Sequence, residues 1–469
     1  MLKGRKLVPI LGDIRFWILL FFFFRLVGIT NAPLESGHSW RQCLTNMIAR
    51  NFSEGGPDIL YPRIDMAGDR TGIIGSEFPF YNYLIYLLSS LFGYAHWYGR
   101  IINLLISSIG TYYFFLLAGK LSDRRIAFSS TIILLCSIWF GYSRKIMPDT
   151  LSVSLVIIGL FYGYQYLYSN SLKSLLLFMI FSGLGVLCKI PAMSLMAAIP
   201  VILLVKEIPA KRKLIVAITG LLCLFPAFMW YFYWVPYLVQ TYHYQLYFPK
   251  GLMEGIREIL PLTWQLFEKF YFSSLFSYLA FGFFVAGVYY ISRSKTLWLK
   301  LGLAMISLIF LAFIIKTGAV FPLHSYYIIP FTPVMAFIAG HGIAKLPLKF
   351  QYIPLLIIAL EGIGNQQHDF FLKPSELYKL RLESKMEKWV GKNEKIVING
   401  GPSPQEIYFA NRKGWTINSE QINLNNLEEY RKKGARYLVI DKHLSEALIP
   451  EFPVIYSDPD FSISLLERK

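Results

Sequence analysis

Eleven long apolar stretches constrain the fold of this chain more than any other feature of its sequence. A segment needs about 20 mostly apolar residues to cross a bilayer as a helix, because lipid offers no partner to unpaired backbone groups. The pattern therefore predicts a mainly α-helical, polytopic membrane protein. The stretches are 14–30, 98–119, 126–143, 150–168, 173–188, 190–205, 214–235, 271–291, 297–315, 326–343 and 350–364. The pair 173–188 and 190–205, separated only by Lys189, can also be read as one kinked hairpin.

The distribution of charge predicts an orientation for these spans. Of 469 residues 16% are charged, against about 25% in an ordinary soluble domain. The net charge of +17 lies almost entirely in the first 364 residues, which hold 30 basic and 14 acidic groups, whereas residues 365–469 hold 16 and 15. The N-terminal segment MLKGRK and the segments between spans that would face the cytoplasm together carry 16 Lys and Arg against two acids, Asp123 and Glu207. The positive-inside rule places the N-terminus in the cytoplasm of a multi-pass protein of the inner or plasma membrane, and a disordered nucleic-acid-binding arm is excluded.

Two extracytoplasmic regions follow from this topology. Residues 1–364 form a transmembrane domain whose first outer loop, 31–97, holds six of its 14 acids. Within that loop, residues 38–52 have the spacing of an amphipathic helix on the membrane surface, and a second apolar segment is too short for a confident span. Residues 365–469 read as a small α/β domain, in which the sequence SPQE suggests a capping box between Ser403 and Glu406. Residues 236–270 are expected to form an aromatic outer loop.

Ionisable side chains gather at the outer ends of several spans. They are Arg144, Lys145, Asp149, Lys189, Lys316 and His324, with Tyr326 and Tyr327 beside them. A carboxylate can take a proton from an acceptor hydroxyl, and cations can hold a phosphate whose charge grows as a bond to it breaks. Nucleotide sugars are absent outside the cytoplasm, so a sugar donor there would be linked to a lipid carrier such as a polyprenyl phosphate. A transporter would also satisfy this inventory.

The order of several motifs resembles the GT-C membrane glycosyltransferases, in particular the group that joins protein O-mannosyltransferases and lipid A aminoarabinose transferases. The motifs are FPFYNYLIYLLSSLFG before the second span, RKIMPD, CKIPA and HSYYIIP. HSWRQ, IARNF, RID and EFP are similar to a bacterial, family-39-like subfamily. The resemblance implies an inverting transferase that takes a sugar from a polyprenyl-phosphate carrier and passes it to an extracytoplasmic lipid, glycan or protein.

The resemblance also implies site residues, with two departures from the family pattern. The acid that the family carries near the start of its first outer helix is missing here, because that position falls at Arg41 and Gln42. The candidates for a catalytic base are therefore Asp65, Glu77 and His38, and Glu77 stands where the family has a Lys. Asp149 matches the second acidic position and Lys189 the phosphate-side Lys. Arg41, Arg144, His324 and Tyr326 are further substrate-binding candidates.

Three points stay open at the level of sequence. An exporter or flippase of lipid-linked glycans would share the spans and cationic lipid contacts, although it predicts charges along a midplane path rather than at one face. A non-catalytic member of the family, which binds a polyprenyl lipid without reacting with it, would explain why the family's acid is missing. A divalent metal could bind the loop acids, but neither they nor the four cysteines, Cys43, Cys136, Cys188 and Cys223, form a closed ligand set.

Overall fold

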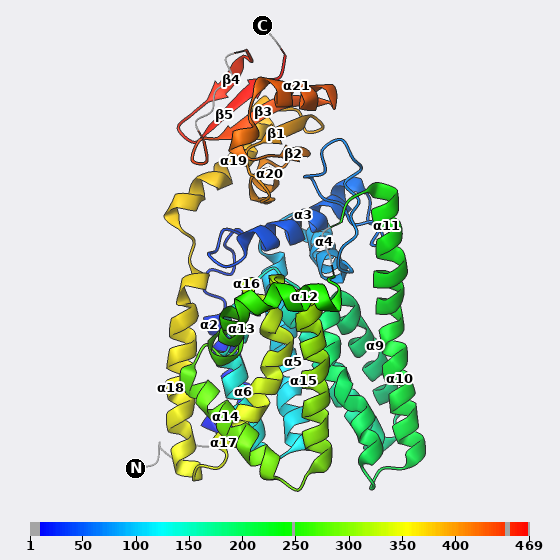
Figure 1. The fold of residues 1–469 in the computed structure, drawn as a ribbon. Coiled ribbons are helices and arrows are strands. Elements are labelled where there is room, and N and C mark those ends of the chain that lie inside the picture. The colour runs from blue at the N-terminus through cyan, green and yellow to red at the C-terminus, as the bar shows by residue number, and fades with distance from the viewer. Residues whose placement is uncertain (1–9, 246–248, 446–450, 468–469) are drawn as a thin grey trace. The chain divides into compact units, whose positions relative to one another are not determined.

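The computed structural model describes residues 10–245, 249–445 and 451–467 (Figure 1). The chain divides into two compact units, which we describe separately. Unit 1 comprises residues 1–29, 100–233 and 248–370, and unit 2 comprises residues 30–99, 234–247 and 371–469. The predicted division into domains at residue 364 stays a prediction.

Unit 1 is helical. Each of the eleven apolar stretches falls on a helix, and the fold class predicted from the sequence is confirmed. With η denoting 3-10 and π helices, its elements are α2 (Ile14–Phe24), α5 (Tyr98–Leu121), α6 (Arg124–Cys136), α7 (Trp139–Tyr142), α8 (Asp149–Ser169), α9 (Leu172–Cys188), η1 (Ile190–Leu204), α10 (Ala210–Met229), η2 (Trp230–Trp234), α12 (Leu252–Ile259), η3 (Leu260–Leu262), α13 (Thr263–Glu268), η4 (Lys269–Ser273), α14 (Tyr278–Arg293), α15 (Leu297–Thr317), α16 (Val320–Leu323), η5 (Ser325–Phe331), α17 (Thr332–Ile343), α18 (Leu348–Gln366) and η6 (Gln367–Phe370).

Several of these helices are long and apolar enough to cross a membrane. Among the described residues, five helical segments meet both criteria, and a sixth does if the pair Leu252–Ser273 and Tyr278–Arg293, bent by 94°, is one span. The five are Tyr98–Leu121, Asp149–Ser169, Ala210–Tyr242, Leu297–Thr317 and Ser325–Ile343. Residues 236–270, expected to be a loop, are largely helical. The stretches 173–188 and 190–205 are two separate helices, α9 and η1.

Glycine allows two helices of unit 1 to pack closely. A Cβ atom on Gly287 of α14 would lie 1.9 Å from the carbonyl oxygen of Ile338 in α17, and one on Gly342 of α17 would lie 2.3 Å from the carbonyl oxygen of Phe283 in α14. Small residues at such crossings let backbones approach, which is how helices associate in lipid.

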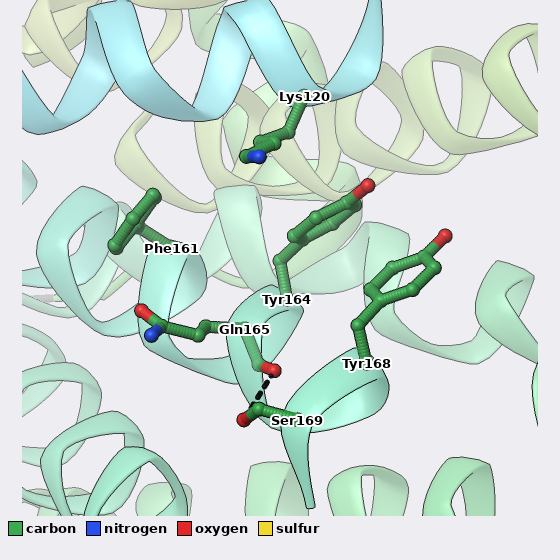
Figure 2. Close-up of a pocket in the computed structure, with 6 residues that line it drawn as sticks. All are labelled: Lys120, Phe161, Tyr164, Gln165, Tyr168 and Ser169. Atoms are coloured by element: carbon green, nitrogen blue, oxygen red, sulfur yellow. Dashed lines mark hydrogen bonds between the residues drawn. The ribbon is translucent and has the colours of Figure 1, made fainter.

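Two adjacent cavities lie beside the C-terminal end of α8. The first, of about 550 Å³, is lined by Lys120 of α5 and by Phe161, Tyr164, Gln165, Tyr168 and Ser169 of α8 (Figure 2). The second, of about 570 Å³, is lined mainly by apolar side chains of α5, α8, η1, α15 and α17. Lys120, Tyr164 and Tyr168 line both cavities, so the two spaces adjoin.

Unit 2 combines helices with one sheet. Its five strands have the order β2-β1-β3-β5-β4, with β1 parallel to β2 and β3, and β5 antiparallel to β3 and β4. Val397 of β1 is in register with Trp415 of β2 and Leu438 of β3. The elements are α3 (Ser39–Gly55), α4 (Phe80–Phe92), α11 (Val235–Tyr242), η7 (Pro374–Arg381), α19 (Leu382–Trp389), β1 (Lys395–Ile398), α20 (Gln405–Ala410), β2 (Gly414–Thr416), η8 (Ser419–Gln421), α21 (Leu424–Lys432), β3 (Ala435–Asp441), β4 (Val454–Ser457) and β5 (Phe461–Leu465).

The helix predicted at 38–52 is α3, and its apolar side lies in the core of unit 2. Met47 and Phe52 are buried in one cluster with Tyr408 of α20 and Val439 of β3. The apolar residues whose spacing suggested a helix on the membrane surface therefore pack against the C-terminal segment instead.

The predicted capping box at the start of α20 does not form. Pro404 is the N-cap residue of this helix, and the side chain of Ser403 accepts only from the backbone N–H of Gln405. Glu406 instead pairs with Lys379, with a nitrogen to oxygen distance of 3.1 Å.

Candidate active site

A buried ion pair joins two of the predicted site residues in unit 1. The Nζ atom of Lys189 lies 3.0 Å from Oδ1 of Asp149, and the two residues are 5% and 2% exposed. Asp149 is in the first turn of α8, where the helix dipole favours a negative charge. A buried pair of this kind is costly to break, because either charge left alone would be desolvated without compensation.

The local sequence places Lys189 at a break between helices. Its backbone is extended, with φ −158° and ψ 111°, between the end of α9 and the start of η1. Pro191 has no N–H and its ring would clash with the carbonyl of Leu187, so α9 cannot continue through it. The hydroxyl of Ser152 on α8 donates to the carbonyl oxygens of Gly185 and Lys189, at 2.7 and 3.3 Å, and ties the break to α8.

Aromatic residues of η5 adjoin the ammonium group of Lys189. Its Nζ atom lies 5.1 Å from the ring centroid of Tyr326 and 5.9 Å from that of Tyr327, within the range of cation–π attraction. The ring of His324 lies 5.6 Å from that of Tyr326. Four predicted site residues of unit 1, Asp149, Lys189, His324 and Tyr326, are therefore linked by contacts.

The segment between α7 and α8 contributes two buried cations. The Nζ atom of Lys145 lies 3.3 Å from Oδ1 of Asp369, and Lys145 is 1% exposed. The guanidinium carbon of Arg144 lies 4.2 Å from the ring centroid of Phe370, and its Nη1 donates to the carbonyl oxygen of Val27. Arg144 and Lys145 thus point to different partners.

In unit 2, Glu77 and Arg41 form an ion pair. Both side chains are partly accessible, at 27% and 15%. His38 is the N-cap residue of α3 and has a left-handed backbone with φ 57°, and its carbonyl oxygen accepts from the N–H of Arg41 at 3.1 Å. Three of the four predicted site residues of the first loop, His38, Arg41 and Glu77, are therefore linked at the start of α3.

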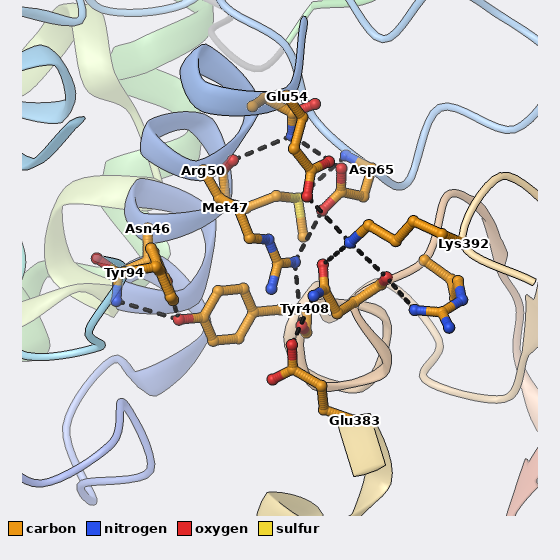
Figure 3. Close-up of polar contacts among 12 residues, drawn as sticks. Asn46, Met47, Arg50, Glu54, Asp65, Tyr94, Glu383, Lys392 and Tyr408 are labelled. Atoms are coloured by element: carbon orange, nitrogen blue, oxygen red, sulfur yellow. Dashed lines mark hydrogen bonds and ion pairs between the residues drawn. The ribbon is translucent and has the colours of Figure 1, made fainter. Parts of the chain in front are cut away.

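The fourth, Asp65, lies in a buried polar network (Figure 3). Its two carboxylate oxygens accept from Arg50 at 3.1 Å and from Asn51 at 2.8 Å, and Asp65 is 4% exposed. Burial alone would lower the pKa of Arg50, but the negative charge of Asp65 and the nearby tyrosines outweigh it, so the pKa is raised. Arg50 also donates to the carbonyl oxygen of Tyr408 at 3.1 Å, so this network connects the first loop to α20.

Comparison with known proteins gives this geometry a context. Residues 76–232 match the family described as dolichyl-phosphate-mannose-protein mannosyltransferase. No curated protein matches this chain. Among solved structures, ArnT from Cupriavidus metallidurans bound to undecaprenyl phosphate matches with a TM-score of 0.63 and 12% identity, over 96% of this chain and 98% of that one. The chain has the GT-C fold.

A second GT-C structure supports the same assignment. The oligosaccharyltransferase AglB from Archaeoglobus fulgidus, in complex with an inhibitory peptide and a dolichol-phosphate, matches with a TM-score of 0.56 and 12% identity. The match covers 91% of this chain and 69% of AglB. The resemblance to GT-C glycosyltransferases inferred from the sequence motifs is confirmed at the level of the fold.

Sequence reasoning missed several charged residues of this chain. Arg25 lies within the first apolar stretch and is fully buried, where it donates to the carbonyl oxygen of Phe21 at 3.0 Å and to the hydroxyl of Ser143. A charge inside an apolar run is itself a signal of function or of specific pairing, and this signal was available. Asp369 carried no such signal, because it lies in a polar stretch of ordinary composition, whereas Arg50 lies in the predicted helix 38–52 and in the motif IARNF but was not selected.

The described residues do not offer a ready metal site. No three His, Cys, Asp or Glu side chains within them converge as ligands. Asp149 and Asp65 face cations of the chain itself, which would compete with a divalent ion.

Proposed function

We propose that this chain is a membrane glycosyltransferase that moves a sugar from a polyprenyl-phosphate carrier to an extracytoplasmic lipid, glycan or protein, with inversion at the anomeric carbon. The observation that carries the proposal is the buried Asp149–Lys189 pair beside Tyr326, in a chain of GT-C fold. ArnT, whose fold is similar over nearly its whole length, has been solved with undecaprenyl phosphate bound.

The reaction requires three actions. The acceptor hydroxyl oxygen forms a bond to the anomeric carbon, the bond from that carbon to the phosphate oxygen breaks, and the hydroxyl proton passes to a carboxylate. Polyprenyl phosphate leaves with an additional negative charge, which a fixed cation stabilises more in the transition state than in the ground state.

Lys189 is the proposed cation for that phosphate. Its ammonium group is held by Asp149 and by aromatic rings rather than by water, so little reorganisation accompanies the reaction. Arg144, His324 and Tyr326 are proposed to line the donor site with it.

Glu77 is the proposed base, because its carboxylate is partly accessible and already paired with a cation, Arg41. His38, in contact with the same turn, is the alternative proton acceptor. Both carboxylate oxygens of Asp65 already accept hydrogen bonds, from Arg50 and Asn51. We therefore propose that Asp65 positions these side chains in unit 2 rather than acting as the base. The positive-inside distribution supports placing this site outside the cytoplasm.

A transfer assay tests this proposal. Purified protein is incubated with a panel of polyprenyl-phosphate sugars, and release of polyprenyl phosphate is measured for wild type and for Asp149→Asn, Glu77→Gln and Lys189→Met. We expect losses of about 10²-fold or more, the usual scale for removing a catalytic acid, base or charge stabiliser.

Glu254→Gln is the matched control, since Glu254 is exposed and, among the described residues, its carboxylate contacts Lys250 and the backbone N–H of Gly251, neither of which belongs to the proposed site. Thermal melting of each variant separates loss of chemistry from loss of folding. Full activity in all three variants would show that the site is wrong, and no turnover by wild type with any donor would show that the reaction is wrong.

A further inference from the structure

The two cavities beside the C-terminal end of α8 lie far from the proposed active site. Asp149 begins α8 and Tyr164, Tyr168 and Ser169 lie near its other end, 21 residues in all. At 1.5 Å per residue the helix is about 30 Å long, roughly the thickness of the hydrocarbon core. The cavities are thus near the opposite membrane face from the buried ion pair.

The larger cavity has the character of a hydrocarbon site. Its lining includes Leu160 of α8, Leu195 and Ile199 of η1, and Val334 and Phe337 of α17. Its volume of about 570 Å³ falls within the usual range of about 300–1,000 Å³ for ligand pockets. Protein interiors are close-packed, and water does not fill apolar cavities well, so a hydrocarbon chain is the natural occupant.

The adjoining cavity has the character of a headgroup site. Lys120, Gln165, Ser169 and the hydroxyls of Tyr164 and Tyr168 give it polar atoms (Figure 2). Within the described ranges, no hydrogen bond or ion pair connects the ammonium group of Lys120 to another side chain. An ammonium group at the mouth of an apolar cavity is complementary to a phosphate that carries an acyl chain.

More positive charge lies at the same end of α8. Arg212 of α10 donates to the carbonyl oxygens of Leu167 and Tyr168, at 3.2 and 3.0 Å. Its neighbours Lys211 and Lys213 are basic, and Glu207, which lines the apolar cavity, is the one acid among the lining residues of the two cavities. Basic pockets between membrane helices on the cytoplasmic side are where anionic lipid headgroups bind.

We propose that the paired cavities bind one anionic phospholipid, with its phosphate at Lys120 and an acyl chain between α8, η1 and α15. This site is separate from the donor site, and the choice of a phospholipid as its occupant rests on the proposed function. A phospholipid fits better than a polyprenyl phosphate, because the reacting phosphate of the latter belongs at Lys189, near the other end of α8.

Native mass spectrometry of the full chain in detergent tests the proposal. Wild type is titrated with dioleoyl phosphatidylglycerol and, in parallel, with dioleoyl phosphatidylcholine, whose headgroup is zwitterionic. We expect phosphatidylglycerol to be retained at least about tenfold more strongly, which corresponds to about 1.4 kcal/mol.

Two variants locate the binding. Lys120→Ala removes the ammonium group and should abolish the preference for phosphatidylglycerol, and Ala198→Phe fills the apolar cavity and should reduce retention of both lipids. Lys173→Ala is the matched control, because this exposed lysine starts α9, close in sequence to the end of α8, but lines neither cavity.

Three results would overturn the proposal. The first is equal retention of the two lipids by wild type, and the second is unchanged retention in both Lys120→Ala and Ala198→Phe. The third comes from a competition experiment, in which undecaprenyl phosphate displaces phosphatidylglycerol from wild type but not from Ala198→Phe. The last would assign the cavity to the polyprenyl chain. Melting temperatures measured without lipid confirm that each variant is folded.

Discussion

Asp441 shows how a single buried acid in unit 2 is controlled by its surroundings. It ends strand β3, is fully buried, and accepts from the hydroxyl of Tyr378 at 2.7 Å and from the N–H of His443 at 3.0 Å. Burial raises its pKa above the ordinary value, and these hydrogen bonds offset only part of the shift. The folded chain therefore holds the proton of Asp441 more tightly than the unfolded chain does.

This raised pKa predicts the sign of a pH effect. The contribution of Asp441 to stability is largest below its unfolded pKa and is lost as pH rises through its folded pKa. As pH falls from neutrality toward the ordinary carboxyl pKa of about 4, the folded state should gain stability from Asp441 and from Glu406, whose pKa burial also raises. Thermal unfolding followed across this range should show a smaller gain for Asp441→Asn than for wild type. An identical pH profile in the two proteins would contradict the assignment.

Among the elements, the long periodic helices could be predicted, whereas two of the five short strands could not. The apolar stretches and the helix at 38–52 were predicted because burial imposes a regular spacing over many residues. Strands β2, of three residues, and β4, of four, are too short to show alternation, and neither was predicted. Asp149 and Lys189 were each predicted as site residues, but their ion pair was not. The pair depends on the crossing of α8 and α9, which no local sequence pattern encodes.

The crossing of α14 and α17 gives a prediction at this scale. Gly287→Ala would place a methyl group 1.9 Å from a backbone oxygen, so the helices must separate, at a cost of about 1–3 kcal/mol. Gly282→Ala, on the same helix with no atom within 4 Å, should be neutral or stabilising by up to about 1 kcal/mol. Melting temperatures of the two variants in one detergent compare them directly. Equal melting would show that this contact is not close in solution.

At the scale of the whole molecule, two distant segments depend on each other. The first loop and the C-terminal segment share the core that holds Met47, Phe52, Tyr408 and Val439. The sequence did not reveal this, because a helix packed on a protein core and a helix lying on a membrane have the same apolar spacing.

A chain that ends at Phe370 should therefore fail to order α3. Its apolar side would lose its partners in α20 and β3, so we expect the amide hydrogens of residues 39–55 to exchange far faster than in the full chain. Hydrogen exchange measured by mass spectrometry tests this, with α8 as the internal control, since its contacts lie in unit 1. Equal protection of α3 in both chains would contradict a shared core.

The shared core also sets an order of events during synthesis. Met47 leaves the ribosome more than 300 residues before Tyr408 and Val439. At about 5–20 residues per second, this interval is on the order of tens of seconds. During that time the apolar side of α3 has its partners in α4 but lacks those in α20 and β3, so part of it stays uncovered until the last hundred residues arrive.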